Sequence, residues 1–186
     1  MLEHARTSTG EMQSTDLNAL ADEYLRLAYH GIKAKNLGFA CELKTHFDPQ
    51  LGLVEVVAQD IGRVLLNLFT NALHAVQLQA KQAGAAYRPA ITVQTEGRQG
   101  AVVIRVIDNG IGMSQEVQQK IFQPFFTTKP AGEGTGLGLS LSYDIITKGH
   151  GGSLVVESWE DAGTEFVINL SVKVDLVMCK PKQKST

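Results

Sequence analysis

The chain has 186 residues and a formal net charge of −2, with 44% hydrophobic and 19% charged residues. These values are typical of one soluble globular domain with extensions, and they do not indicate a nucleic-acid-binding surface. No apolar run approaches the roughly 20 residues of a membrane span, no secretory signal pattern is visible, and Cys41 and Cys179 lack the spacing of a metal site or a disulfide framework.

The first predicted element is a helix. Residues 1–14 are polar and show no clear apolar stripe. Between residues 17 and 28 apolar side chains recur at helical spacing, and Asp16 stands where an N-cap is expected. Gly31 is expected to end this helix.

Short runs with alternating or β-branched residues predict the strands. Six such runs are found, at residues 39–47, 53–57, 91–96, 101–107, 153–157 and 164–170. We expect the first two to pair with each other, the middle two to form a hairpin, and the last two to pair across a turn at residues 161–163.

The longest predicted helix covers residues 59–83 and has a continuous apolar stripe. Asn67, Asn71 and His74 lie off that stripe and, at i, i+4 and i+7, share one face. Asparagine is unfavourable inside a helix because its amide competes for backbone hydrogen bonds. Two asparagines one turn apart therefore indicate a binding function, with a solvated or capping pair as the alternative.

Two glycine clusters flank a segment rich in Gly, Pro and Phe. The first, Asp-Asn-Gly-Ile-Gly at 108–112, directly follows a predicted strand, and the second, at 134–138, leads into a helical pattern. Glycine allows close backbone approach to a ligand, and a glycine-rich turn that opens a helix offers N–H groups to phosphate. Each cluster alone could be an ordinary turn, and neither the Walker pattern nor the dinucleotide pattern is present.

The order of elements is helix, two strands, helix, hairpin, loop, helix, hairpin. It predicts an α/β (α+β) two-layer sandwich, in which a mixed β-sheet packs against three helices. We expect this domain to cover residues 16–175 and residues 176–186 to form a disordered, lysine-rich tail.

Over about residues 16–173 the chain resembles the catalytic ATP-binding domain of sensor histidine kinases, within the GHKL ATPase superfamily. The similar motifs are an N box at 67–71, a first glycine box at 108–112, an F box at 122–126, a second glycine box at 134–138 and a weaker last one at 163–166. The resemblance implies that an ATP lid lies between the glycine boxes, and that residues 1–15 are the end of a dimerisation helix or a linker.

The resemblance also implies roles for individual residues. Asp108 would accept the adenine amino group, and Asn71, together with Asn67, would supply oxygen to Mg2+ and act as the catalytic residues. Mg2+ prefers oxygen ligands and keeps several waters, so one or two protein oxygens suffice. The full set expected to bind ATP is Asn71, His74, Asp108, Gly110, Gly112, Phe126, Lys129, Gly134, Thr135, Gly136, Leu137, Gly138 and Thr164.

One position departs from the common form of the family. The residue three after the second N-box asparagine is often Lys or Arg, whereas this chain has His74. We expect Lys129, in the lid, to supply the missing positive charge near the phosphates. A solvated loop lysine is the alternative.

None of the five histidines is followed by Glu or Asp, as the phosphoacceptor of these kinases usually is. His150 is expected to close a helix end, and His4 lacks the motif. We therefore expect an acceptor outside this chain and negligible self-phosphorylation. The implied partners are the dimerisation and phosphoacceptor domain of a parent kinase, which would be a homodimer, and a response regulator. We expect a cytoplasmic location without membrane contact by this chain, and a membrane-bound parent protein remains open.

Two other functions remain open at the level of sequence. One is an anti-sigma-factor-type kinase of the same superfamily, which would phosphorylate serine on a partner. The other is a non-catalytic module that senses or docks a nucleotide.

Overall fold

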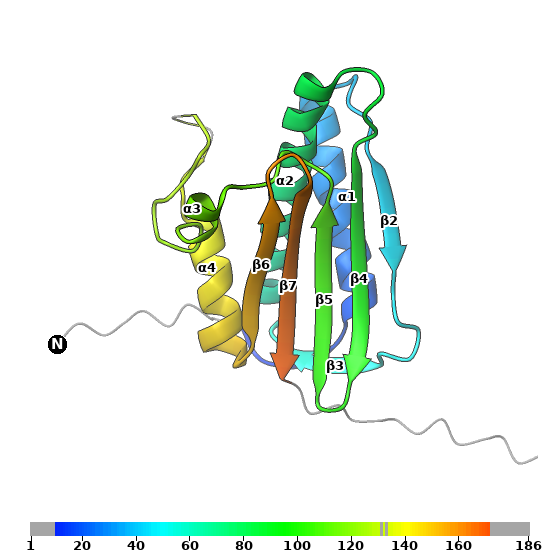
Figure 1. The fold of residues 1–186 in the computed structure, drawn as a ribbon. Helices are drawn as coiled ribbons and strands as arrows, with labels where there is room; N and C mark the ends of the chain where they lie inside the picture. Colours follow the sequence, from blue (N-terminus) through cyan, green and yellow to red (C-terminus); the bar gives the residue numbers. More distant parts are fainter. Residues whose placement is uncertain (1–9, 131, 133, 172–186) are drawn as a thin grey trace, which may run out of the picture.

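A five-stranded sheet forms one layer of the computed structural model, which describes residues 10–130, 132 and 134–171 (Figure 1). Its strands are β2 (Glu42–His46), β4 (Ala90–Arg98), β5 (Ala101–Asp108), β6 (Ser153–Trp159) and β7 (Gly163–Ser171). They lie in the order β2-β4-β5-β7-β6. Only the β2–β4 pairing is parallel, so the sheet is mixed as predicted.

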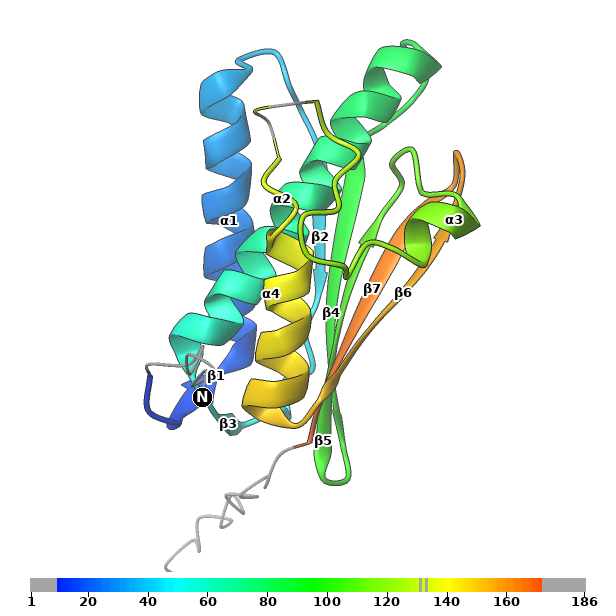
Figure 2. The same cartoon turned by 90° about the vertical axis from the view of Figure 1, so that its left-hand side faces the viewer.

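Helices form the second layer. Figure 2 shows α1 (Leu17–Lys35), α2 (Ala58–Ala83) and α4 (Gly138–Asp144) on the same side of the sheet. The strands turn alternate side chains toward them, so that Val102, Ile104 and Val106 of β5 are buried in the core. The predicted two-layer sandwich of a mixed sheet and three helices is therefore confirmed.

Helix α1 begins as predicted but ends later. The Asp16 side chain accepts a hydrogen bond from the amide of Ala19, as an N-cap does. Gly31 does not end the helix, which continues to Lys35, and the amide of Asn36 donates to Ile32. A single glycine costs a helix only about 1 kcal/mol relative to alanine, so packing of the preceding turns outweighs it.

Helix α2 begins one residue before the predicted position and ends at Ala83, followed by Gly84 with a φ of 75°. Its buried stripe is wider than the predicted one, because Phe69 and Leu73 are also fully buried. No helix in the described part of the chain is long and apolar enough to cross a membrane.

A second sheet consists of two strands whose pairing the sequence did not predict. Strand β3 (Leu53–Val56) pairs antiparallel with β1 (Gln13–Asp16), whereas β2 pairs with β4. The predicted pair of residues 39–47 and 53–57 was wrong. The polar sequence of β1 has no strand pattern, and backbone pairing with β3 alone makes it a strand.

The last helix ends on a histidine, as predicted. A π-helical turn, Ile145–Gly149, continues α4, and His150 follows it. The Nδ1 atom of His150 lies 2.9 Å from the carbonyl oxygen of Ile145, and Nε2 accepts a hydrogen bond from the amide of Val57, 3.2 Å away. The imidazole therefore joins the end of this helix to the start of α2.

A partly buried polar network ties the start of α1 to the sheet. Thr95, which is 5% exposed, donates a hydrogen bond to the Asn18 side chain and accepts one from the amide of Asp48. Asn18 in turn donates to the Asp48 carbonyl, and the Asp48 carboxylate accepts from the amide of Gly97. Two of these groups, the Asn18 side-chain oxygen and the Asp48 amide, are bonded to the one hydroxyl of Thr95.

We expect Thr95→Val to lower the free energy of unfolding by about 1–3 kcal/mol, because it leaves the Asn18 oxygen and the Asp48 amide without this partner. Urea unfolding measures the change. Thr92→Val, on the opposite face of β4, is the matched control and is expected to change stability by less than about 0.5 kcal/mol. Equal stability of the two variants would contradict a role for the network.

Candidate functional site

The candidate site starts at the end of β5, where Asp108 is only 5% exposed. Its carboxylate accepts hydrogen bonds from the backbone amides of Gly110, at 2.8 Å, and of Thr164. Burial raises the pKa of Asp108 to about 7, although these two amides favour the charged form. The chain thus maintains a desolvated carboxyl group that a ligand N–H donor would stabilise in its ionised form.

Gly110 brings this carboxylate against helix α2. A Cβ atom on Gly110 would lie 2.5 Å from the carbonyl carbon of Ala75 and 2.8 Å from the amide nitrogen of Val76. The amide of Ile111 donates to the carbonyl of Ala75, 3.4 Å away. No side chain larger than hydrogen fits at Gly110, so this glycine sets the distance between the first glycine box and the N-box helix.

Gly112 connects the same turn to the far edge of the sheet. It has a φ of +65°, and a Cβ there would lie 1.8 Å from the carbonyl oxygen of Trp159. The amide of Asp161 donates to the carbonyl of Ile111, 2.8 Å away. Gly112 therefore packs on the β6–β7 turn, and it acts on the site through the backbone.

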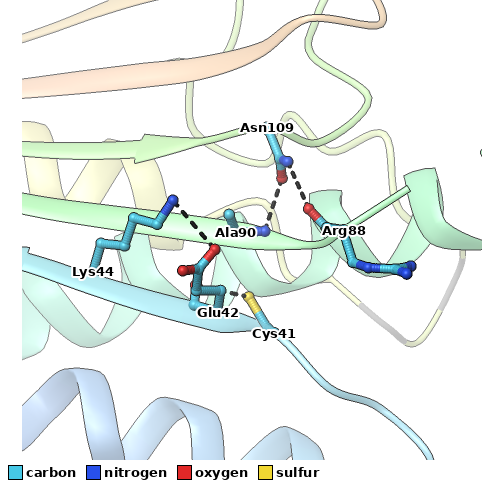
Figure 3. A network of polar contacts seen from close by, with 6 residues as sticks. All are labelled: Cys41, Glu42, Lys44, Arg88, Ala90 and Asn109. Atoms are coloured by element: carbon cyan, nitrogen blue, oxygen red, sulfur yellow. Dashed lines mark hydrogen bonds and ion pairs between the residues drawn. The ribbon is translucent and has the colours of Figure 1, made fainter. Parts of the chain in front are cut away.

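Asn109, which the sequence did not single out, joins β5 to the start of β4 (Figure 3). Its Oδ1 accepts from the amide of Ala90 at 2.9 Å, and its Nδ2 donates to the carbonyl of Arg88 at 2.8 Å. The Tyr87 hydroxyl also donates to Asn109, at 2.8 Å. An asparagine directly after a strand-end aspartate is a signal for such a turn, but its partners are not readable from sequence.

The Cys41 thiol and the Tyr87 hydroxyl lie close enough to Asp108 for its charge to affect their pKa values. Burial, and then the Asp108 charge, raise the pKa of each group to about 12. The Cys41 thiol consequently stays protonated near neutral pH and is not a nucleophile. Figure 3 shows its sulfur directed to the carbonyl of Glu42, whose side chain pairs with Lys44 on the exposed edge strand.

Lys129 reaches the N-box helix from the lid. Its Nζ donates to the Oδ1 of Asn71, 3.1 Å away. Lys129 is partly buried, and a Cβ on Gly134 would lie 3.1 Å from the Cβ of Lys129 and 2.7 Å from Thr127. His74 follows one turn along α2 and is also partly buried. The lid lysine and the asparagine are thus in contact.

Asn67 faces α4 and not the lid. Its Nδ2 donates to the hydroxyl of Ser142, 3.1 Å away. A Cβ on Gly138 would lie 2.3 Å from the Oδ1 of Asn67. The first turn of α4 therefore packs directly on the Asn67 amide.

The F box and the second glycine box are joined through their backbones. The amide of Phe125 donates to the carbonyl of Gly136, 2.8 Å away, and the amide of Leu137 donates to the hydroxyl of Thr135. Phe126 packs against the hydrophobic core, whereas Phe125 is 75% exposed. Phe126 thus anchors the segment that leads to the glycine box.

Thr164 meets Asp108 through its backbone. The two residues are opposite each other in the β5–β7 pairing. The Thr164 hydroxyl lies 2.8 Å from that of Ser158, which donates to the carbonyl of Gly163. The side chain of Thr164 is therefore engaged within the sheet.

A cavity of about 510 Å3 lies elsewhere, between β6 and the short helix α3 (Gln115–Gln118). It is lined by Met113, Ser114, Gln115, Gln118, Val156, Glu157, Ser158, Trp159 and Glu160. None of these residues belongs to the predicted ATP-binding set. The set is instead held together by α2, the end of β5, the lid and the start of α4.

The N-box residues fit a magnesium ion whose remaining ligands are phosphate oxygens and water. The Asn71 oxygen already accepts a cationic donor, the Lys129 ammonium group. The described residues contain no group of three or more His, Cys, Asp or Glu side chains that could hold a metal by themselves. An ion bound here would thus depend on the nucleotide for most of its ligands.

The chain is similar to several known proteins. A model of the histidine kinase-, DNA gyrase B- and HSP90-like ATPase family matches residues 56–174. The signal transduction histidine-protein kinase AtoS of Escherichia coli (strain K12) is 35% identical over 174 residues, which are 92% of this chain and 26% of that protein. The sensor protein FixL of Bradyrhizobium diazoefficiens is 32% identical over 160 residues, which are 86% of this chain and 29% of that protein.

The solved structures point the same way. The catalytic domain of histidine kinase ThkA, in a nucleotide-free form, superimposes with a TM-score of 0.69 at 32% sequence identity, and the match covers 87% of this chain and 95% of that one. This chain spans 26% of AtoS and 34% of the sensor histidine kinase ZraS of Salmonella typhi, so it corresponds to about a quarter to a third of these relatives.

The Asp108 carboxyl group should make folding stability depend on pH. Its pKa in the folded protein, about 7, exceeds its ordinary value of 3.8, so its contribution is complete below that ordinary value and is lost as the pH rises through 7. We expect the wild type to lose roughly 2–3 kcal/mol more than Asp108→Asn between pH 5 and pH 8. Urea unfolding at both pH values measures this difference. Glu157→Gln, an exposed carboxylate on β6, is the control and should behave as the wild type.

Proposed function

Because this chain belongs to the histidine kinase-, DNA gyrase B- and HSP90-like ATPase family, we propose that it is the ATP-binding catalytic domain of a two-component sensor histidine kinase. In this proposal it delivers the γ-phosphoryl group of ATP to a histidine outside the chain. The observation that carries the proposal is the buried carboxylate of Asp108, held by Gly110 against the helix that bears Asn71.

Asp108 is the proposed adenine-recognition residue. A carboxylate that accepts the adenine amino group makes a charge-assisted hydrogen bond, and guanine has no donor at that position. Gly110 and Gly112 support this residue indirectly, because Gly110 lets the end of β5 approach α2 and Gly112 lets the following turn pack on Trp159. The two backbone amides on Asp108 orient the carboxylate before any ligand arrives.

Asn71 and Lys129 form the proposed phosphate end, with His74 and the amides of the second glycine box around Gly136 and Gly138. Mg2+, when bound, would neutralise phosphate charge. The amide oxygen of Asn71 would hold the ion, and the Lys129 ammonium group, now 3.1 Å from that oxygen, would donate to a phosphate oxygen. Phosphoryl transfer depends mainly on such positioning and charge neutralisation, so no side-chain nucleophile is required.

The proposed acceptor lies in another domain. His4 lies outside the described residues, and none of the five histidines has an acidic successor. We propose a parent protein that supplies the dimerisation and phosphoacceptor domain, forms a homodimer and passes the phosphoryl group to a response regulator. We also propose that this domain works in the cytoplasm and that residues 1–15 lead from the acceptor domain. Relatives named as histidine kinases favour this function over serine phosphorylation.

We expect ATP to bind in preference to GTP, and Asp108→Asn to weaken ATP binding by roughly 1.5–3 kcal/mol, the usual contribution of a hydrogen bond to a charged group. Titration calorimetry with Glu157→Gln as control measures the change. Adenosine affinity should also rise about tenfold from pH 6 to pH 8 in the wild type, because the base binds the ionised form of a group with a pKa of about 7. ATP binding that is equal in the wild type and Asp108→Asn would contradict the assignment.

Asn71→Ala tests the phosphate end. We expect it to reduce the affinity for ATP in the presence of Mg2+ about tenfold or more, because it removes a metal ligand, and to leave adenosine affinity unchanged. Calorimetry with both ligands separates the two effects. A variant that weakens ATP and adenosine equally would identify Asn71 as a structural residue.

A further inference from the structure

Ser142, on the second turn of α4, is a buried polar residue to which neither the sequence motifs nor the proposed phosphate contacts assign a role. It is 2% exposed. Its hydroxyl donates a hydrogen bond to the carbonyl of Gly138, 2.9 Å away, and accepts one from the Nδ2 of Asn67, 3.1 Å away. One hydroxyl thus connects the N-box helix to the residue at which α4 begins.

These two bonds determine the orientation of the Asn67 side chain. The only proton of the Ser142 hydroxyl is used on Gly138, so the hydroxyl can only accept from Asn67, and an accepted bond must come from the NH2 group. The amide oxygen is then turned the other way, toward Gly138, where an added Cβ would lie 2.3 Å from it. Rotation of the amide by 180° would exchange the two ends and break one of the two hydrogen bonds.

We infer that Ser142 is a positioning residue, which keeps the oxygen of Asn67, and not its NH2 group, at the second glycine box. The inference rests on the proposed function and on the expectation from sequence that Asn67, together with Asn71, supplies oxygen to Mg2+ at the phosphate end of the site. An amide oxygen there is a ligand for Mg2+, whereas an NH2 group would repel the ion and compete with it for phosphate oxygens.

The experiment compares ATP affinity with Mg2+, ATP affinity with EDTA, and adenosine affinity. For Ser142→Ala we expect a loss of about threefold to tenfold for ATP with Mg2+, the usual effect of one hydrogen bond, and no loss for the other two ligands. Ser140→Ala is the matched control, because the Ser140 hydroxyl bonds only within its own helix, to Leu137. Ser142→Cys, with a weak acceptor of similar size, is the second variant should the alanine variant fail to fold.

The double variant Asn67→Ala, Ser142→Ala completes the test. It should equal Asn67→Ala alone, because Ser142 acts through Asn67. The inference would be overturned if Ser142→Ala lowered all three affinities. It would also be overturned if Ser142→Ala changed none of them while Asn67→Ala lowered the affinity for ATP with Mg2+. If Asn67→Ala itself leaves the Mg2+ dependence intact, the proposed role of Asn67 fails, and the positioning role of Ser142 fails with it.

Discussion

The arrangement of the site depends on one close contact, the approach of Gly110 to the backbone of α2 at Ala75. An added Cβ would lie 2.5 Å from the Ala75 carbonyl carbon, so the glycine and the helix are as close as backbones allow. This contact places Asp108, at a strand end, beside the helix that carries Asn71. The two ends of the proposed nucleotide site come from separate parts of the chain, and their spacing is set here.

Burial gives the site its electrostatic character. Asp108 is desolvated by the same core that stabilises the sandwich, and its pKa rises although two amides donate to it. At the opposite end, Lys129 brings a positive charge to the neutral amide of Asn71. The buried carboxyl group of Asp108 suits the neutral base of ATP, and the positive charge of Lys129 suits its phosphates. The fold places these two residues at different points along α2.

Much of the fold and the order of the site motifs follow from local patterns. The alternation in β4 to β7, the apolar stripe of α2 and the Asp16 cap depend on neighbours in sequence, and the structure confirms them. The helix end at Gly31 was wrong because packing outweighed a local preference. The resemblance to histidine kinase catalytic domains, which those motifs carried, is confirmed by the family match and by the ThkA structure.

Other features were decided only by tertiary structure. Strand β1 exists because β3 offers it a backbone edge, and its polar sequence carries no signal. The contacts of Lys129 with Asn71, and of Ser142 with Asn67, join residues 58 and 75 positions apart. The sequence by itself determined the order and spacing of the motifs, because periodicity and glycine spacing are local. Which atom of each side chain faces the site was decided by long-range hydrogen bonds, which form only when the layers pack.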